Sequence, residues 1–388
     1  MIPPFANHLP VRIRFGEGVA RELGEILAAE RVPTALVVID AGLEEASPAV
    51  AAALATIEAQ GGALVRHVKE AGEPTHLAVD AAAEAIRASG AGAVVALGGG
   101  SVMDTAKAAR LCVQRGLTFG EFLASERVYD KPSIPLICVP TTAGTGSEVS
   151  GGAVITDEQS GRKAGIAHPT LRAQHALVDP ELTWSVPPSM TSFTGVDALA
   201  QAIAGMVAKC RTPVGDAIAL EATRLIGGSL VRAHRDGSDR EARAAMACGS
   251  MMAGLTMNIS DCSAEHSLAQ ALGGEFHAPH GLTIGLVFAE TLERESAHVP
   301  EQLERVADAL GMPEDGSGDG SRAVRGVRDL LRELDFPVLS SLGVDDSDLD
   351  RLTGLAQADY FISQAPAPWS DAEVRAAFER ALAIRTRT

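Results

Sequence analysis

The sequence predicts an α/β domain followed by an all-helical domain. Strand and helix patterns alternate over residues 1–185, which is typical of an open, mostly parallel sheet. Strand patterns then stop, and one helical pattern follows another over residues 186–388. A chain of 388 residues is long enough to build two hydrophobic cores. We therefore place the domain boundary near Val186, Pro187 and Pro188, where the pattern changes.

Alternating or continuous apolar runs predict the strands of the first domain. The predicted strands are 11–15, 34–40, 63–68, 93–97 and 135–139. Apolar residues at helical spacing predict helices over 18–30, 48–60 and 75–89. Residues 151–155 and 163–166, with a turn over 156–161, predict a β-hairpin of the kind that covers the edge of a sheet.

The second domain shows helical spacing throughout. The predicted helices are 189–208, 212–234, 239–258, 261–272, 281–295, 300–310, 321–334, 346–357 and 370–385. The run of Gly, Asp and Ser over 314–321 predicts an exposed loop inside this domain.

The composition is that of an ordinary globular protein, with 46% hydrophobic and 21% charged residues. Only 4% of the residues are aromatic, so Ala, Val, Leu and Ile must build the cores. The net charge of -17 argues against a nucleic-acid partner, because phosphate contacts need clustered Lys and Arg.

The chain also carries no sign of a membrane or an oxidising compartment. It has no secretory signal pattern at the N-terminus and no run that approaches the roughly 18 apolar residues of a membrane span. Its five cysteines form no CxxC pair, so we expect small buried hydrophobic side chains in a reducing compartment. The predicted location is the cytoplasm. The cysteines are Cys112, Cys138, Cys210, Cys248 and Cys262.

A glycine-rich turn follows the predicted strand 93–97. Gly98, Gly99, Gly100 and Ser101 open a helical pattern, and free N–H groups at a helix start favour an anion such as a pyrophosphate. Ser101 is expected to cap this helix, with Asp104 completing a capping-box-like pair. The alternative is a tight strand-to-helix turn without a ligand.

A second loop of this type follows the strand 135–139. It runs from Pro140 to Glu148 and contains Thr141, Thr142, Thr145 and Ser147, with Ser150 close behind. Ligands of open α/β sheets bind at the carboxyl ends of the strands, so two such loops predict a dinucleotide-binding domain.

Asp40 ends an earlier strand. A carboxylate there can accept hydrogen bonds from ribose hydroxyls and repel a 2′-phosphate, which favours NAD over NADP. The alternative is a solvated turn aspartate.

The densest group of imidazoles lies between Ser263 and Gly281. His266 and Gln270 are one helical turn apart, and His277 and His280 flank a proline. A solvated helix end would explain these residues equally well. A carboxylate from elsewhere would turn them into a divalent-metal site.

Asp197 is the candidate carboxylate. It lies among apolar neighbours, where it needs a partner charge or a metal, and Gln201 follows on the same helix face. Asp197, His266 and His280 form a three-ligand set with an open position, as a metal that polarises a carbonyl oxygen requires.

These motifs together resemble the iron-containing (group III) alcohol dehydrogenase family over nearly the whole chain. The matching segments are Gly98–Lys107, Pro140–Glu148, Asp179-Pro180, Gly195–Leu199 and Ala278–Gly281. The resemblance implies a dinucleotide-binding domain, a helical domain, NAD(P) in the cleft between them, and often a homodimer. It implies an enzyme that reduces aldehydes or oxidises alcohols, and it places Lys163 near the nicotinamide, where the alternative is an exposed hairpin charge.

The sequence departs from the family pattern at two usual histidines. Gln201 stands at the fourth ligand position, and Gln270 stands at a second pocket position. Ala204 stands where many members of the family have an acidic residue. Glutamine is a weaker ligand for Fe²⁺ or Zn²⁺ than imidazole. The remaining set resembles the zinc-dependent glycerol dehydrogenase branch, whereas the maleylacetate reductase branch is thought to work without metal.

The preferred hypothesis is hydride transfer between nicotinamide and a small aldehyde or ketone, with the carbonyl polarised by a metal on Asp197, His266 and His280. Gln201 is a possible fourth ligand, and His277 or a metal-bound water is the expected acid, because Gln270 cannot relay a proton. The alternative for His277 is a surface residue without a role in the reaction. Two rivals remain, a metal-independent reductase of an acidic substrate and a non-catalytic nucleotide-binding relative.

Overall fold

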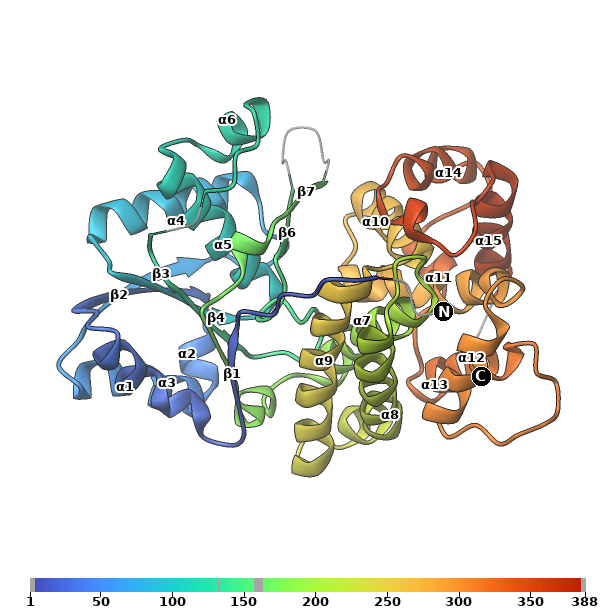
Figure 1. Cartoon of the computed structure of the whole chain (residues 1–388), viewed down its shortest axis with the longest axis horizontal. Coiled ribbons are helices and arrows are strands. Elements are labelled where there is room, and N and C mark those ends of the chain that lie inside the picture. Colours follow the sequence, from blue (N-terminus) through green and yellow to red (C-terminus); the bar gives the residue numbers. More distant parts are fainter. Residues whose placement is uncertain (1–3, 131–132, 157–162, 385–388) are drawn as a thin grey trace. The chain divides into compact units, whose positions relative to one another are not determined.

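The computed structural model describes residues 4–130, 133–156 and 163–384 (Figure 1). The chain divides into two compact units. The α/β unit comprises His8–Thr142 and Gly146–Val186. The helical unit comprises the chain from Pro187 onwards, together with short segments that include Ala143–Thr145.

The α/β unit contains a six-stranded parallel sheet with the order β1-β8-β5-β4-β2-β3. Its strands are β1 (Arg12–Phe15), β2 (Thr34–Asp40), β3 (Ala63–Lys69), β4 (Ala93–Gly98), β5 (Leu136–Pro140) and β8 (His175–Val178). The register pairs Asp40 with Lys69 and Gly98 with Pro140. The carboxyl ends of four strands therefore meet at one edge of the sheet, where ligands of such folds bind.

Helices cover both faces of this sheet (Figure 1). In β2, Ala35, Val37 and Ile39 pack with α1 (Leu23–Ala29) and α3 (Pro48–Ala59). The alternate residues Leu36 and Val38 pack with α4 (His76–Ser89) and α5 (Gly100–Arg115). A strand with two buried faces explains the continuous apolar run in the sequence.

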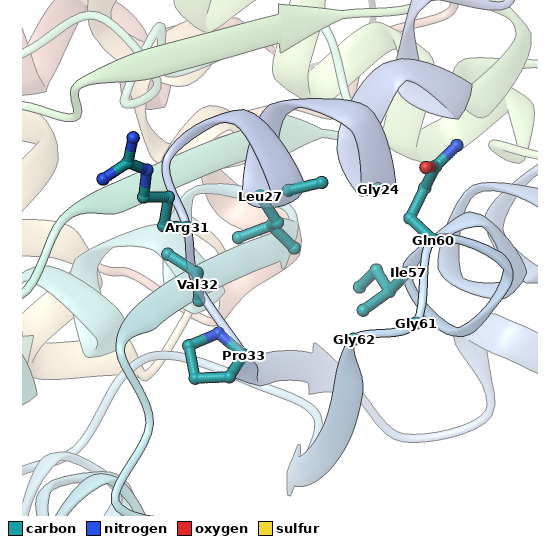
Figure 2. Close-up of a pocket in the computed structure, with 10 residues that line it drawn as sticks. Gly24, Leu27, Arg31, Val32, Pro33, Ile57, Gln60, Gly61 and Gly62 are labelled. Atoms are coloured by element: carbon teal, nitrogen blue, oxygen red, sulfur yellow. The ribbon is translucent and has the colours of Figure 1, made fainter.

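A hollow of about 300 Å³ lies beside α1 and α3 at the amino ends of β2 and β3 (Figure 2). Leu27, Val32, Pro33 and Ile57 give it an apolar lining, and Arg31 and Gln60 stand at its sides. The glycine-rich turn follows the carboxyl end of β4, so the hollow and the turn lie at opposite edges of the sheet.

Several predicted elements of the α/β unit need correction. The helix expected over 18–30 is a 3-10 turn, η1 (Val19–Glu22), followed by α1. The hairpin β6 (Gly152–Thr156) and β7 (Lys163–Ala167) forms its own two-stranded sheet and adds no strand to the six-stranded one. Its side chains Ala153, Ile155 and Ile166 join the core beside α5, because that face of the hairpin is apolar. Residues 157–162, which hold most of the predicted turn, lie outside the described residues.

Some short elements were not predicted. They are α2 (Leu43–Ala46), α6 (Phe119–Ala124), η2 (Pro169–Leu171), η3 (Pro180–Thr183) and β8. The buried Arg110 stabilises the approach to β8 by donating hydrogen bonds to the carbonyl oxygens of Thr170, Leu171 and Arg172.

The helical unit contains each of the nine predicted helices. They are α7 (Pro188–Val207), α8 (Pro213–Arg235), α9 (Arg240–Ser260), α10 (Ala264–Phe276), α11 (His280–Ser296), α12 (Pro300–Ala309), α13 (Ser321–Glu333), α14 (Leu349–Gln357) and α15 (Asp371–Ala383). Two 3-10 turns, η4 (Leu339–Leu342) and η5 (Phe361–Gln364), lie between them. Within residues 4–130, 133–156 and 163–384, a membrane span would need a longer or more apolar helix than any that is present.

Small residues let α7 pack closely against its neighbours. A Cβ on Gly205 would lie 2.0 Å from Thr256 Cγ2 on α9, and one on Gly195 would lie 2.3 Å from Leu230 Cδ1 on α8. This packing suits a chain that is poor in aromatic residues. Of the cysteines, Cys112, Cys138 and Cys262 are buried as expected, whereas Cys210 is exposed.

Candidate active site

Asp197, His266 and His280 converge in the helical unit. Asp197 Oδ1 lies 3.8 Å from His266 Nε2 and 3.6 Å from His280 Nε2. One nitrogen or oxygen of each residue lies within 4.8 Å of those of the other two. The three residues come from α7, α10 and α11, so tertiary packing assembles the cluster.

Gly281 explains how His280 reaches Asp197. Pro279 is the N-cap of α11, and His280 is therefore the first residue of that helix. A Cβ on Gly281 would lie only 2.3 Å from the Phe193 carbonyl oxygen on α7. The glycine thus lets the start of α11 lie directly against the α7 backbone, four residues before Asp197.

The residues present fit a divalent metal. Asp197 and His266 are only 2% and 3% exposed, and a buried carboxylate beside two imidazoles is a typical donor set for Fe²⁺ or Zn²⁺. Gln201 lies one turn after Asp197 on the same face of α7. Its Oε1 atom is buried and has no hydrogen-bond partner among the described residues. This oxygen is therefore available as a fourth metal ligand.

Cys262 also lies near the cluster, with its Sγ atom 3.7 Å from His266 Nε2. Burial raises the pKa of the Cys262 thiol to about 11. Cys262 is fully buried, as a small side chain of the hydrophobic core would be.

Glu265 lies on the other side of the His266 ring. Its Oε1 atom is 2.7 Å from His266 Nδ1, and both side chains are buried.

In the α/β unit, the glycine-rich turn brings β4 and α5 together. A Cβ on Gly98 would lie 2.6 Å from Val102 Cγ2 and 3.2 Å from Asp40 Oδ2. Thr142 Oγ1 is 3.4 Å from the place of a Cβ on Gly99, and the Thr141 N–H donates to the Gly98 carbonyl oxygen over 3.1 Å. The turn and the second loop therefore lie side by side at the carboxyl ends of β4 and β5.

The predicted capping box at this turn is wrong. The N-cap of α5 is Gly99, which has no side-chain cap, and Ser101 is the second residue of the helix. The Asp104 carboxylate instead accepts hydrogen bonds from Ser147 Oγ over 2.8 Å and from the Val154 N–H over 2.9 Å. Because no side chain caps the helix start, its first turn suits an anionic ligand.

Ser147 and Ser150 hold a buried lysine. Lys107 Nζ donates to Ser147 Oγ over 2.7 Å, to Ser150 Oγ over 3.3 Å and to the Gly152 carbonyl oxygen over 2.8 Å. Burial raises the pKa of the neighbouring Glu148 to about 7, and Lys107 partly opposes this rise. The two serines therefore tie the second loop to the buried Lys107 on α5.

Asp40 lies against the glycine-rich turn. Its carboxylate accepts the Gly99 N–H, and burial raises its pKa although Lys69 acts in the opposite direction. Lys69 Nζ is 3.8 Å from Asp40 Oδ1 and donates to the carbonyl oxygens of Glu70 and Gly72. Lys163 Nζ pairs with Glu73 Oε2 over 3.1 Å.

Comparison with known proteins identifies the family. The family described as "Iron-containing alcohol dehydrogenase" matches residues 10–180, and the one described as "Fe-containing alcohol dehydrogenase family, C-terminal" matches residues 191–382. The chain belongs to the iron-containing alcohol dehydrogenase family. The predicted family, fold class and enzyme class are confirmed.

Relatives of this family differ in what their names say they act on. The chain is 34% identical to a choline dehydrogenase of Bacillus subtilis (strain 168), over 90% of this chain and 88% of the relative. It is 32% identical to an NAD-dependent methanol dehydrogenase of Bacillus methanolicus, over 92% and 94%. A sulfoacetaldehyde reductase from Bifidobacterium kashiwanohense, solved in complex with NAD+, is 28% identical with a TM-score of 0.89 and covers 98% of this chain and 99% of its own.

Two residues that the sequence analysis named as site candidates, Gln270 and His277, lie outside the three-residue cluster. Gln270 is half-buried on α10, one turn after His266. His277 is exposed and ends α10 in the left-handed conformation, with φ of 51°. Thr145 belongs to the segment Ala143–Thr145 of the helical unit.

Sequence reasoning missed a group of residues behind His266. The Phe361 ring lies 5.6 Å from the His266 ring, and Tyr360 Oη donates to Asp261 Oδ2 over 2.8 Å. Asp261 has a φ of 64°, which is strained for a residue with a side chain. The only signal in the sequence was the adjacent Tyr360 and Phe361 in a chain with two tyrosines.

Proposed function

We propose that this chain is an NAD-linked, metal-dependent oxidoreductase that interconverts a small alcohol and the corresponding aldehyde or ketone. The observation that carries the proposal is the convergence of Asp197, His266 and His280, with the buried Oε1 of Gln201 on the next turn. When bound, the metal would polarise the carbonyl oxygen and NADH would supply the hydride.

The residues of the chain would supply binding, orientation and a dry environment. Asp197 contributes the negative charge of the ligand set, and its burial strengthens its attraction to a cation. The amide of Gln270 can orient a substrate by hydrogen bonding but cannot relay a proton. The exposed imidazole of His277 can accept and donate a proton, so it stays the candidate acid on α10.

The α/β unit would hold the dinucleotide. The uncapped start of α5 suits the pyrophosphate, and the Asp40 carboxylate suits ribose hydroxyls and opposes a 2′-phosphate. We therefore favour NAD over NADP. The names of the B. methanolicus and B. kashiwanohense relatives, both of which mention NAD, support this choice.

Metal analysis paired with a turnover assay tests the proposal. The protein is stripped with a chelator, reloaded with Fe²⁺ or Zn²⁺, and assayed for NADH oxidation with sulfoacetaldehyde, formaldehyde, betaine aldehyde and longer aldehydes. We expect about one metal per chain and turnover of at least one aldehyde. His266→Ala should lose both, whereas the exposed His298→Ala should keep both. Absence of both metal and turnover in the unaltered protein would overturn the proposal.

A second candidate function rests on Gln201 and Gln270, which stand where the resemblance to the family predicts histidines. These amides favour a metal-independent reductase whose substrate carries its own acidic group. Turnover that persists in metal-free protein, with no loss in His266→Ala, would support this alternative. A non-catalytic nucleotide-binding relative would bind NADH but reduce no aldehyde in either form.

A further inference from the structure

We propose that Glu265 is a positioning residue for His266, which it holds with Nε2 directed at Asp197. The inference rests on the proposed metal site. Glu265 Oε1 lies 2.7 Å from His266 Nδ1, and Glu265 is only 1% exposed. A carboxylate so deeply buried needs a specific partner, and the imidazole is that partner.

The hydrogen bonds assign the proton on the His266 ring. A carboxylate only accepts, so the Glu265 contact requires a proton on Nδ1. In a neutral imidazole this leaves a lone pair on Nε2, the atom that lies 3.8 Å from Asp197 Oδ1. A metal ligand needs that lone pair, and a carboxylate behind the ring also raises its basicity.

Glu265 is itself held in place from the start of α10. The N–H of Ser263, which is the N-cap residue, donates to Glu265 Oε1 over 3.1 Å. Ser263 Oγ donates to Glu295 Oε1 over 2.6 Å, and Glu295 is a fully buried residue of α11. The start of α10 is therefore tied to the helix that carries His280, which restricts the movement of Glu265.

A purely structural role predicts a different outcome. An acid in the first turn of a helix stabilises that helix through its N–H groups, whatever the neighbouring imidazole does. If that were the only role of Glu265, its replacement would lower stability but would leave the His266 tautomer and the metal affinity unchanged. These two readouts therefore separate positioning from helix stabilisation.

The experiment compares Glu265→Gln and Glu265→Met with the unaltered protein. Glutamine keeps an acceptor oxygen for His266 Nδ1–H and for the Ser263 N–H. Methionine has a side chain of similar length but no acceptor oxygen. Zn²⁺ affinity is measured by competition with a chromophoric chelator. We expect the dissociation constant to rise about 10–100-fold for methionine, with a smaller rise for glutamine. Glu275→Gln, at the far end of α10, is the matched control and should stay within about twofold of the unaltered protein.

The tautomer is read in metal-free protein by ¹⁵N-histidine NMR, at a pH high enough for the His266 ring to be neutral. The His266 signals should show the proton on Nδ1 in the unaltered protein and in Glu265→Gln, and a shift toward Nε2 protonation in Glu265→Met. An unchanged tautomer and an unchanged Zn²⁺ affinity in Glu265→Met would overturn the inference. If Glu265→Met does not fold, a Glu265→Gln variant with no loss of Zn²⁺ affinity and with Nε2 protonated would overturn it. If the unaltered protein binds no Zn²⁺, the proposed function fails while the NMR result still decides the role of Glu265.

Discussion

His280 Nε2 lies 3.6 Å from Asp197 Oδ1, and this contact depends on the close approach of α11 to α7 at Gly281. The two ligands would separate if the helices moved apart by the width of a methyl group. Changes at the helix contact are therefore expected to alter the site without touching a ligand.

Gly281→Ala should weaken the site and the fold together. The new Cβ would lie 2.3 Å from the Phe193 carbonyl oxygen, so α11 must shift. We expect a loss of about 1–3 kcal/mol in the free energy of unfolding and a clear fall in Zn²⁺ affinity. Gly228→Ala on α8 is the control, because a Cβ there meets nothing within 4 Å, and it should stabilise the protein by about 0.5–1 kcal/mol. Equal effects of the two substitutions would contradict the packing argument.

Gln201→His should raise metal affinity. Gln201 Oε1 is buried without a hydrogen-bond partner among the described residues, one turn from Asp197, and imidazole is a stronger ligand than an amide oxygen. Chelator competition should show Zn²⁺ binding tighter by about tenfold or more. Gln201→Ala should bind Zn²⁺ more weakly than the unaltered protein. If neither substitution changed the affinity, the Gln201 side chain would lie outside the coordination sphere.

Stability of the α/β unit should fall as the pH rises, because of Glu148. Burial raises the pKa of Glu148 to about 7 from its ordinary value of 4.5. The folded protein therefore binds this proton more tightly than the unfolded chain does. This proton's contribution to the free energy of unfolding is fully present below pH ~4.5. It is lost as the pH rises through ~7, and the total loss is about 3 kcal/mol.

Glu148→Gln should remove this pH dependence, because glutamine stays neutral. The free energy of unfolding is measured in urea at pH 5 and at pH 8. From pH 5 to pH 8 the unaltered protein should lose about 2–3 kcal/mol more than the variant does. The exposed Glu126→Gln is the control and should follow the unaltered protein. Parallel stability curves for Glu148→Gln and the unaltered protein would show that Glu148 is ionised in the fold at both pH values.

Asp40→Asn should shift cofactor preference toward NADPH. The substitution removes the charge that repels a 2′-phosphate, leaves Lys69 beside the site, and keeps an amide oxygen for the Gly99 N–H. Fluorescence titration should show NADPH binding tighter by about tenfold, a gain of about 1.4 kcal/mol, with little change for NADH. An equal loss of both cofactors would mean that Asp40 only supports the glycine-rich turn.

The strongest periodic patterns predicted the fold well. The buried strands β2 and β4 and the nine helices were all evident, because continuous apolar runs and helical spacing are local signals. Errors arose where tertiary packing decides. The helix α5 begins at Gly100, so Ser101 cannot cap it, and the apolar face of the β6–β7 hairpin packs in the core beside α5.

The site was predictable in its ligands and not in their supports. Asp197, His266 and His280 lie in short motifs with distinctive residue types, and the structure brings them together. Glu265 and Glu295 are acids in ordinary helical sequence, and only the packing of α10 against α11 shows that both are buried. The neighbours of these two acids in the chain give no sign of their burial, unlike the apolar residues that flank Asp197.

The three candidate ligands come from three different helices, so a bound ion would act as a cross-link within the helical unit. An ion that binds only the folded chain stabilises it by about 2.7 kcal/mol when present at 100 times its dissociation constant. Melting temperature measured across a series of divalent ions therefore ranks their affinities without any knowledge of the substrate. The ion that the protein prefers can be identified before the reaction it catalyses.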